Sequence, residues 1–148
     1  MNPGGDGIGE NIQTGALPWR RLTGGGMEVL LVTSRLSGRW IVPKGWPMPG
    51  KSLAQAAAQE AFEEAGVTGR IDAEPLGFFQ HVKNFPLGQM EVTIFVHPLA
   101  VEKELSSWPE RGQRQRKWFE PKNAARVVES NDLGSMILKL GQDERQVT

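Results

Sequence analysis

The chain has 148 residues, of which 39% are hydrophobic and 23% charged, and its formal net charge is zero. These values are typical of one globular domain with a real core, and the balanced charge argues against a general nucleic-acid or membrane-surface binder. The absence of cysteine excludes disulfides, thiol catalysis and thiolate metal sites. Two histidines, His81 and His97, are too few for a histidine-rich zinc centre.

The N-terminal segment, residues 1–12, is rich in Gly, Asn and Asp, and we expect it to be a flexible tail. It lacks the basic start and apolar core of a signal peptide, and no apolar run in the sequence approaches the ~20 residues of a membrane span. We therefore expect a cytoplasmic protein with a single domain over residues 13–142 and a short C-terminal tail over residues 143–148.

Apolar and β-branched runs predict three strands in the first third of the chain, at residues 16–22, 27–34 and 39–43. A loop over residues 46–50, with two prolines and a glycine, leads into a predicted helix. Ser52 is its expected N-cap and Gly66 its expected terminator. The predicted apolar face of this helix is Ala54, Ala58, Ala61, Phe62 and Ala65.

The second half of the chain predicts more strands and then two helices. Residues 73–83 and 91–101 are typical of paired strands with a turn at 84–88 between them. A polar loop at 106–113 precedes a last strand at 114–119, and amphipathic helices follow at 121–129 and 132–140. The order lacks βαβ repetition, which indicates an α/β (α+β) fold with a mixed sheet flanked by helices.

Three glutamates, Glu60, Glu63 and Glu64, fall on one side of the predicted helix. At about 100° per residue, their side chains occupy roughly a quarter of its circumference. Like charges three and four residues apart repel one another, whereas hard divalent cations such as Mg²⁺ bind carboxylate oxygens and bridge to substrate phosphates. By itself such a cluster is more typical of a solvated helix face. The glycine-bearing loop before this helix, the spacing and the aliphatic stop after it favour a metal site for phosphate cleavage instead.

The stretch from Gly45 to Val67, GWPMPGKSLAQAAAQEAFEEAGV, resembles the signature of the Nudix hydrolase family, G-x5-E-x7-R-E-U-x-E-E-x-G-U, in which U is aliphatic. Both glycines, the three glutamates and the closing valine stand where the signature has them. Lys51 replaces its first glutamate and Gln59 replaces its arginine, which in the family orients a catalytic glutamate. Because the acid and the base are lost together, no lone charge is left unpaired.

The resemblance implies a Nudix fold, an α/β/α sandwich with the motif helix beside the sheet, and a Mg²⁺-dependent pyrophosphohydrolase in which Mn²⁺ could substitute. Glu60, Glu63 and Glu64 would be catalytic and, with Gly45, would hold the metal; Glu64 would also act as the base. The base could instead lie outside the motif, as in some branches of the family. We expect Gly45 to allow a backbone conformation closed to other residues.

Three segments, 39–43 (RWIVP), 63–67 (EEAGV) and 114–119 (RQRKWF), resemble the diphosphoinositol polyphosphate phosphohydrolase group, which also hydrolyses diadenosine polyphosphates. The resemblance runs over about residues 16–128 and implies a very anionic substrate, which needs several cations around it. It breaks down before the first strand, where polar residues replace the basic ones of the group.

We expect the substrate to contact five basic residues and one exposed indole: Arg39, Lys44, Trp46, Lys83, Arg114 and Arg116. Arg114 matches the substrate-contacting arginine of the group, Lys44 would contact a phosphate as a point charge, and Trp46 would stack on a base. The alternative for the basic residues is an exposed loop or an edge strand protected by charge. His81 is either structural or a further phosphate contact.

Several functions stay open on the sequence alone. Hydrolysis of a diphosphoinositol polyphosphate or a diadenosine polyphosphate is preferred. A ligand-binding or sensory domain that has lost turnover is favoured only by Lys51 and Gln59. An RNA 5′-pyrophosphohydrolase would need a wider basic surface, and no feature decides for an ADP-ribose hydrolase. The expected partner is a small anionic diphosphate, without stable nucleic-acid or membrane binding, and a homodimer is left open.

Overall fold

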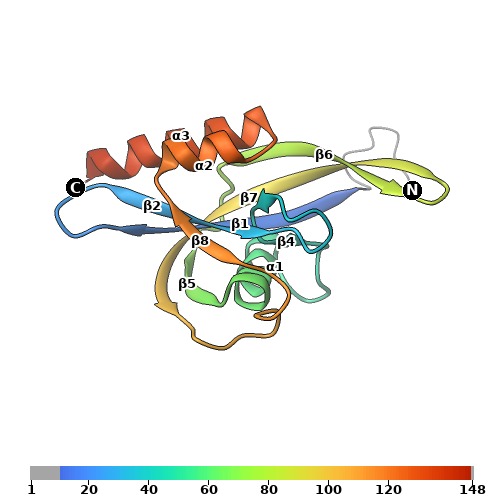
Figure 1. Ribbon diagram of the computed structural model, residues 1–148, viewed down its shortest axis with the longest axis horizontal. Helices are drawn as coiled ribbons and strands as arrows, with labels where there is room; N and C mark the ends of the chain where they lie inside the picture. The colour runs from blue at the N-terminus through green and yellow to red at the C-terminus, as the bar shows by residue number, and fades with distance from the viewer. Residues whose placement is uncertain (1–10, 148) are drawn as a thin grey trace.

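The computed structural model describes residues 11–147, so the tail predicted over residues 1–12 lies almost entirely outside the described part of the chain. The described part forms an eight-stranded mixed sheet with helices on both faces (Figure 1). Its elements, in chain order, are β1 (Ile12–Arg21), β2 (Met27–Thr33), β3 (Trp40–Ile41), β4 (Lys44–Gly45), α1 (Leu53–Glu60), the π-helical turn η1 (Ala61–Ala65), β5 (Val67–Ile71), β6 (Gly77–Phe85), β7 (Gly88–Glu104), β8 (Arg116–Phe119), α2 (Pro121–Val127) and α3 (Asn131–Val147).

The sheet is organised around two long neighbouring strands, β1 and β7. The main strand order is β3-β2-β1-β7-β5, while β4 pairs with β1, β6 with β7 and β8 with β2. β1 and β7 run parallel, from the pair Ile12–Thr93 to the pair Trp19–Ala100, and the other strand pairs are antiparallel. The predicted mixed sheet is therefore confirmed.

Two hydrophobic cores lie on opposite faces of this sheet. Adjacent residues of β1 serve both, because successive side chains of a strand point to opposite faces: Ala16 belongs to the core that contains Ala57 of α1, and Leu17 to the core that contains Ile137 of α3. In Figure 1, α2 and α3 cover one face, and α1 and η1 lie on the other. The fold is the three-layer α/β/α arrangement that the sequence resemblance implies.

The helix that carries the glutamates begins and ends as expected. Ser52 accepts a hydrogen bond from the Gln55 backbone N–H, and the Gln55 side chain accepts one from the Ser52 backbone, which completes a capping box. Gly66 ends the helix in the left-handed conformation, with φ 67° and ψ 34°, where glycine is favoured over other residues. Between these caps, the α-helix widens into the five-residue π-helical turn η1, which the sequence pattern did not predict.

The predicted apolar face of this helix is partly wrong. Ala56 and Ala57 are completely buried, whereas Ala58 and Phe62 are only half-buried. All of these residues except Phe62 are alanines, so hydrophobicity alone gives little indication of which side of the helix faces the sheet.

Several predicted boundaries are wrong, among them those of β7, which is longer than expected. Its 17 residues pair with β6 through their first part and with β5 through their last part, so one strand supports two others. The strand predicted at 73–83 begins only at Gly77, and β5 was missed. Residues 143–147, expected as a tail, continue α3. Within the described residues, no helix is both long and apolar enough to cross a membrane.

Candidate active site

Two of the three motif glutamates meet at the junction of α1 and η1. Glu60 is the last residue of α1 and Glu64 the fourth residue of η1, a separation close to one helical turn, so the side chains stack along the helix. Their carboxyl groups are hydrogen-bonded to each other. Glu64 is buried, with 5% of its surface exposed, and Glu60 is half-buried.

The environment of this carboxyl pair favours a shared proton. Burial raises the pKa of Glu64 to about 8, opposed by the charge of Arg114 and reinforced by the hydrogen bond to Glu60. Burial also raises the pKa of Glu60, and the charge of Glu63 adds to this. The two carboxyl groups therefore favour sharing one proton over carrying two adjacent negative charges. A divalent cation can take the place of that proton, because metal binding to a carboxylate pair releases it.

The third glutamate, Glu63, is bonded to Gln59 and not to the other two. The Gln59 side-chain amide donates to Glu63 Oε2 over 2.7 Å, and the Glu63 backbone carbonyl accepts from the Glu110 N–H over 3.0 Å. Gln59 thus performs the orienting contact expected of the arginine that it replaces. Among the residues described, no three acidic or histidine side chains form a ready set of metal ligands. That all three glutamates converge on a metal stays a prediction.

Gly45 does not adopt the unusual backbone conformation that we expected, because its φ is not positive. A Cβ at this position would lie 2.0 Å from Glu60 Oε2 and 2.5 Å from the Glu60 carboxyl carbon. The Glu60 carboxylate thus packs directly against the backbone of β4, and a larger residue at position 45 would displace the end of the Glu60 side chain.

A cavity of about 740 Å³ lies between β3, β6 and the junction of α2 and α3. Its walls contain Arg39, Lys44 and Lys83, three of the predicted substrate contacts, together with His81 and Glu129. The motif glutamates are not among its lining residues. Lys44 connects the two places, because it lines the cavity and its backbone N–H donates to Glu64 Oε1 over 3.3 Å. The cavity is therefore adjacent to the carboxyl pair.

The cavity is electropositive. The pKa of Lys44 is lowered to about 8 by burial and by the charges of Lys83 and Arg114, against the opposing charges of Glu64 and Glu60. Burial and the same two lysines, Lys44 and Lys83, lower the pKa of His81. Neighbouring cations lower one another's pKa because their positive charges repel. An anion bound between them would relieve this repulsion and stabilise their charged forms.

The acidic residue of the cavity, Glu129, is paired with Arg39. Both side chains of this pair are 62% exposed, so the ion pair is weak and can be exchanged for a ligand.

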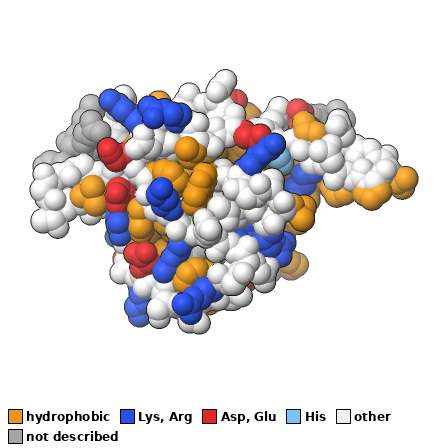
Figure 2. Space-filling model, in the orientation of Figure 1, with side chains coloured by type: hydrophobic (Ala, Val, Ile, Leu, Met, Phe, Trp, Pro, Cys, Tyr) orange, Lys and Arg blue, Asp and Glu red, His pale blue; other side chains and the backbone are white. Residues whose placement is uncertain are grey.

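On the face shown in Figure 2, a histidine lies beside basic and acidic side chains, whereas hydrophobic side chains gather at the end of the β6–β7 hairpin.

Arg114 and Arg116, the other predicted substrate contacts, do not line this cavity. The side chain of Arg114 is 8% exposed; its Nε donates to Glu110 over 2.8 Å and its Nη1 to the Thr33 carbonyl over 3.1 Å, and its Nη2 lies 3.9 Å from Glu64. Arg114 therefore contacts Glu64 from outside this cavity. Arg116 donates to three backbone carbonyls, and its expected role as a substrate contact is not supported by these bonds.

With this geometry in view, comparison with known proteins decides the family. A model of the NUDIX domain matches residues 19–138. The chain belongs to the Nudix family. It is 34% identical over 120 residues to the chloroplastic Nudix hydrolase 21 of Arabidopsis thaliana, covering 79% of this chain and 59% of that protein. It is 36% identical over 105 residues to diphosphoinositol polyphosphate phosphohydrolase 3-beta of Bos taurus, covering 69% and 60%. The chain thus spans about three fifths of the length of these relatives.

Solved structures share the fold of this Nudix domain. A Caenorhabditis elegans Ap4A hydrolase, solved as a binary complex, aligns with a TM-score of 0.64 and 24% identity over 88% of this chain and 94% of that one. A NUDIX hydrolase structure from Listeria monocytogenes aligns with a TM-score of 0.66 and 12% identity over 93% and 96%. These likenesses confirm the fold class.

Two residues of this Nudix domain that sequence reasoning missed lie close to the glutamates or to Arg114. Glu110, in the loop between β7 and β8, binds Arg114 and acts electrostatically on Glu60 and Glu64. Arg35 lines a more open groove of about 540 Å³, together with Arg111 and Arg114. Both belong to irregular segments without a motif, and their only signal in the sequence is charge.

The remaining predicted contact, Trp46, is 44% exposed. It does not line the cavity, but the Lys83 ammonium lies 5.8 Å from the centre of its ring. The indole therefore lies beside a wall of the cavity, where an exposed ring face can stack on a flat group.

Proposed function

We propose that this Nudix domain hydrolyses the pyrophosphate linkage of a small, highly anionic diphosphate, preferably a diphosphoinositol polyphosphate or a diadenosine polyphosphate, with Mg²⁺ as cofactor and Mn²⁺ as a substitute. The observation that carries the proposal is the proton-sharing pair Glu60–Glu64 beside a cavity walled by cations, with Lys44 connecting them. Nudix hydrolases generally use divalent metal ions, and the substrate class is that of the relatives named above.

The residues present fit such a cation. Two stacked carboxyl groups that share a proton form a set of oxygen donors with one negative charge, which a hard divalent ion favours over a proton. Glu60 and Glu64 would hold the ion, with Glu63 and Gly45 next to them. When bound, the ion would neutralise phosphoryl oxygens and lower the pKa of the attacking water.

The protein's own groups then have distinct tasks. Glu64 would accept the proton of the attacking water in its ionised form, which is also the form that binds a cation. Lys44 and Lys83 bind the phosphate oxygens, and Arg39 exchanges Glu129 for the substrate. Arg114 forms an ion pair with Glu64 and helps to keep its side chain in place. Cleavage of the P–O bond leaves two phosphorylated products, whose charge the cations of the cavity stabilise.

The contact between Gln59 and Glu63 speaks against the sensory alternative. That alternative was favoured only by Lys51 and Gln59, and Gln59 donates to Glu63 over 2.7 Å, as the arginine of the signature would. Zero net charge disfavours an RNA substrate. We retain a small-molecule partner, a cytoplasmic location and an open choice between monomer and homodimer as predictions.

The test is phosphate release from a substrate panel in the presence of Mg²⁺. The panel contains a diphosphoinositol polyphosphate, diadenosine tetraphosphate, ADP-ribose and triphosphorylated RNA. We expect turnover of one of the first two and a loss of ~10²- to 10⁴-fold in Glu64→Gln, the range for removing a general base.

The matched control for this test is Glu102→Gln, the same chemical change at an exposed residue of β7. It should retain normal turnover. Tight binding of a diphosphate without release would instead indicate the sensory domain, and near-normal rates in Glu64→Gln would contradict the assignment of the base.

A further inference from the structure

We propose that Arg116 is a positioning residue whose guanidinium group clamps the C-terminal end of η1 and thereby fixes the two glutamates in that turn, Glu63 and Glu64. The consequence for turnover rests on the proposed function, but the clamp itself can be measured without it. The signature's own arginine position, on α1, is Gln59 in this chain, and the clamp is built from a strand, β8.

The end of η1 needs such a partner because the last carbonyls of a helix have no N–H within the helix to accept from. The Phe62 carbonyl accepts from the Gly66 N–H over 3.1 Å, and the Glu63 carbonyl from Glu110 over 3.0 Å. The carbonyls of Ala65 and Gly66, further along, accept from donors outside the helix. A π-helical turn is wider than an α-helical one and occurs mostly as a single turn at functional sites, so its end depends on outside partners.

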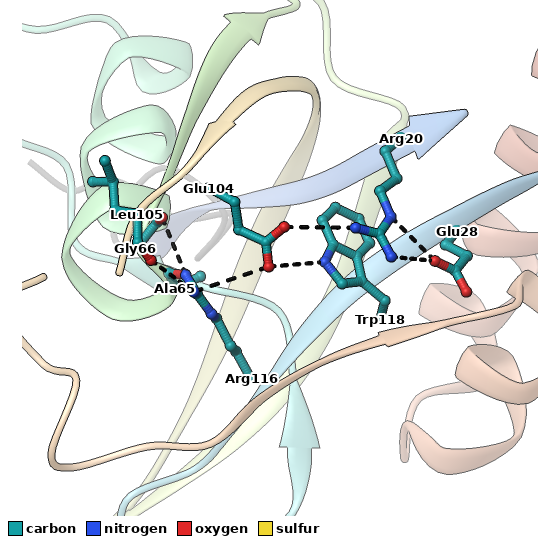
Figure 3. A network of polar contacts seen from close by, with 8 residues as sticks. All are labelled: Arg20, Glu28, Ala65, Gly66, Glu104, Leu105, Arg116 and Trp118. Carbon is teal, nitrogen blue, oxygen red and sulfur yellow. Dashed lines mark hydrogen bonds and ion pairs between the residues drawn. The ribbon is translucent and has the colours of Figure 1, made fainter. Parts of the chain in front are cut away.

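Arg116 supplies these partners with one side chain. Nη1 donates to the Ala65 carbonyl over 2.9 Å and to the Gly66 carbonyl over 3.2 Å, and Nη2 donates to the Leu105 carbonyl over 2.6 Å (Figure 3). The Leu105 N–H in turn donates to the Gly66 carbonyl over 2.8 Å. One planar guanidinium thus ties the end of the catalytic turn to the end of β7, which a flexible point charge such as lysine cannot reproduce.

The guanidinium is itself fixed from its other sides. It stacks on the Trp108 ring at 3.9 Å, and Nη2 lies 3.9 Å from Glu104 Oε1. A Cβ on Gly66 would lie 2.5 Å from Trp108 and 2.8 Å from Arg116 Nη1. The glycine that ends the helix therefore also makes room for the clamp. Arg116 and the stack beneath it form one packed unit with the end of η1.

The same network offers a matched control, Arg20. Arg20 pairs with Glu28 over 2.7 Å and with Glu104 over 3.5 Å, and its guanidinium lies over Trp118 at 4.0 Å (Figure 3). It shares Glu104 with Arg116, yet it makes no contact with η1 among those described. Removing it disturbs the network without touching the catalytic turn.

The test compares Arg116→Lys with Arg20→Lys in the full chain. We measure residue-resolved amide hydrogen exchange, the dissociation constant of Mn²⁺ alone, and kcat and KM for the best diphosphate of the panel. In Arg116→Lys we expect ~10-fold faster exchange confined to residues 61–67. We also expect a ~10-fold weaker Mn²⁺ affinity and a ~10-fold lower kcat with KM within about twofold, as for other residues that orient metal ligands. Arg20→Lys should leave all four quantities unchanged within about twofold.

Unchanged exchange at residues 61–67, or exchange that rises equally over the whole sheet, would overturn the clamp. So would opening of the turn with unchanged Mn²⁺ affinity. If the unmodified protein released no phosphate from any diphosphate, the proposed function would fail, while exchange and Mn²⁺ affinity would still decide the clamp. If Arg116→Lys failed to fold, Gly66→Ala, which displaces the same guanidinium, would carry the same three measurements.

Discussion

Two groups of basic residues in this protein are put to different uses. Arg39, Lys44 and Lys83 line a cavity of about 740 Å³ and are held there only by weak or exposed partners. Arg114 and Arg116 instead donate to carbonyl groups and carboxylates of the protein itself. The positive charges of the first group can interact with a ligand, whereas the N–H donors of the second group are used in hydrogen bonds within the protein.

This difference separates binding from positioning. A cation contributes to substrate binding when its partners can be exchanged, and an exposed ion pair such as Arg39–Glu129 is exchangeable because water screens it. A buried guanidinium with several protein acceptors cannot leave them without stranding polar groups. The two groups should therefore respond to mutation in opposite ways: one in substrate affinity, the other in stability and turnover.

The sharpest contrast is between Arg114→Met and Arg39→Met. Arg114→Met should lower the free energy of unfolding by about 3 kcal/mol, because it strips Glu110 and the Thr33 carbonyl of a buried cation. It should also lower kcat at least about tenfold. Arg39→Met should lower the free energy of unfolding by at most about 1 kcal/mol. Urea unfolding measures both, and equal losses would remove the distinction between the groups.

Gly66→Ala against Gly50→Ala tests the packing at the positioning group. Both glycines have positive φ, 67° and 78°, but a Cβ on Gly50 would meet open space. The left-handed conformation should cost each variant about 1–2 kcal/mol of unfolding free energy. The clash with Trp108 and Arg116 should cost Gly66→Ala a further 1–3 kcal/mol or so. Thermal and urea unfolding give the difference, which should vanish if the clamp region is loosely packed.

Glu64 and Lys44, which lie between the two groups of basic residues, should determine how the stability of the protein depends on pH. The pKa of Glu64 is raised from 4.5 to about 8, so the folded state binds more protons than the unfolded state in that range, and stability falls as pH rises through it. The pKa of Lys44 is lowered from 10.5 to about 8, so the unfolded state binds more protons above pH 8, and stability recovers with rising pH. We therefore expect a minimum near pH 8.

Urea unfolding at intervals from pH 5 to pH 10, without metal, measures this minimum, whose depth should be on the order of 2 kcal/mol. The groups around Glu64 that take part are Arg114, Glu60, Glu110 and Lys44. Glu64→Gln should reduce the fall below pH 8, leaving only the part that comes from Glu60, and should keep the recovery above it. A flat profile in the unmodified protein would show that Glu64 is charged throughout.

The smallest effect is expected for Lys83→Ala. Loss of one partly exposed cavity cation should raise KM about 3- to 10-fold and leave the free energy of unfolding within about 0.5 kcal/mol. The rise should shrink at high salt, because screening already weakens the contact. Lys103→Ala, on the exposed end of β7, is the control and should leave KM unchanged. A stability loss without a change in KM would place Lys83 in the positioning group.

Much of the fold follows from local patterns. Ser52 and Gly66 mark both ends of the catalytic helix, because capping and the left-handed stop depend only on neighbouring residues. The mixed sheet follows from the element order. The length of β7 and the presence of β5 did not follow, since strand pairing between distant segments decides where a strand ends. The phase of the helix was also hidden, because its surface is largely alanine on more than one side.

The sequence by itself determined the family, the helix that carries the carboxylates and which basic residues are available. These follow from residue types and from spacing along one helix, which do not depend on distant contacts. Only the tertiary structure decided how these groups are used. It brought Glu60 and Glu64 together and hydrogen-bonded Glu63 to Gln59. It also gave Arg114 and Arg116 acceptors within the protein, while Arg39 lines the cavity. A side chain's role depends on which distant carbonyls and carboxylates surround it, and folding alone sets those neighbours.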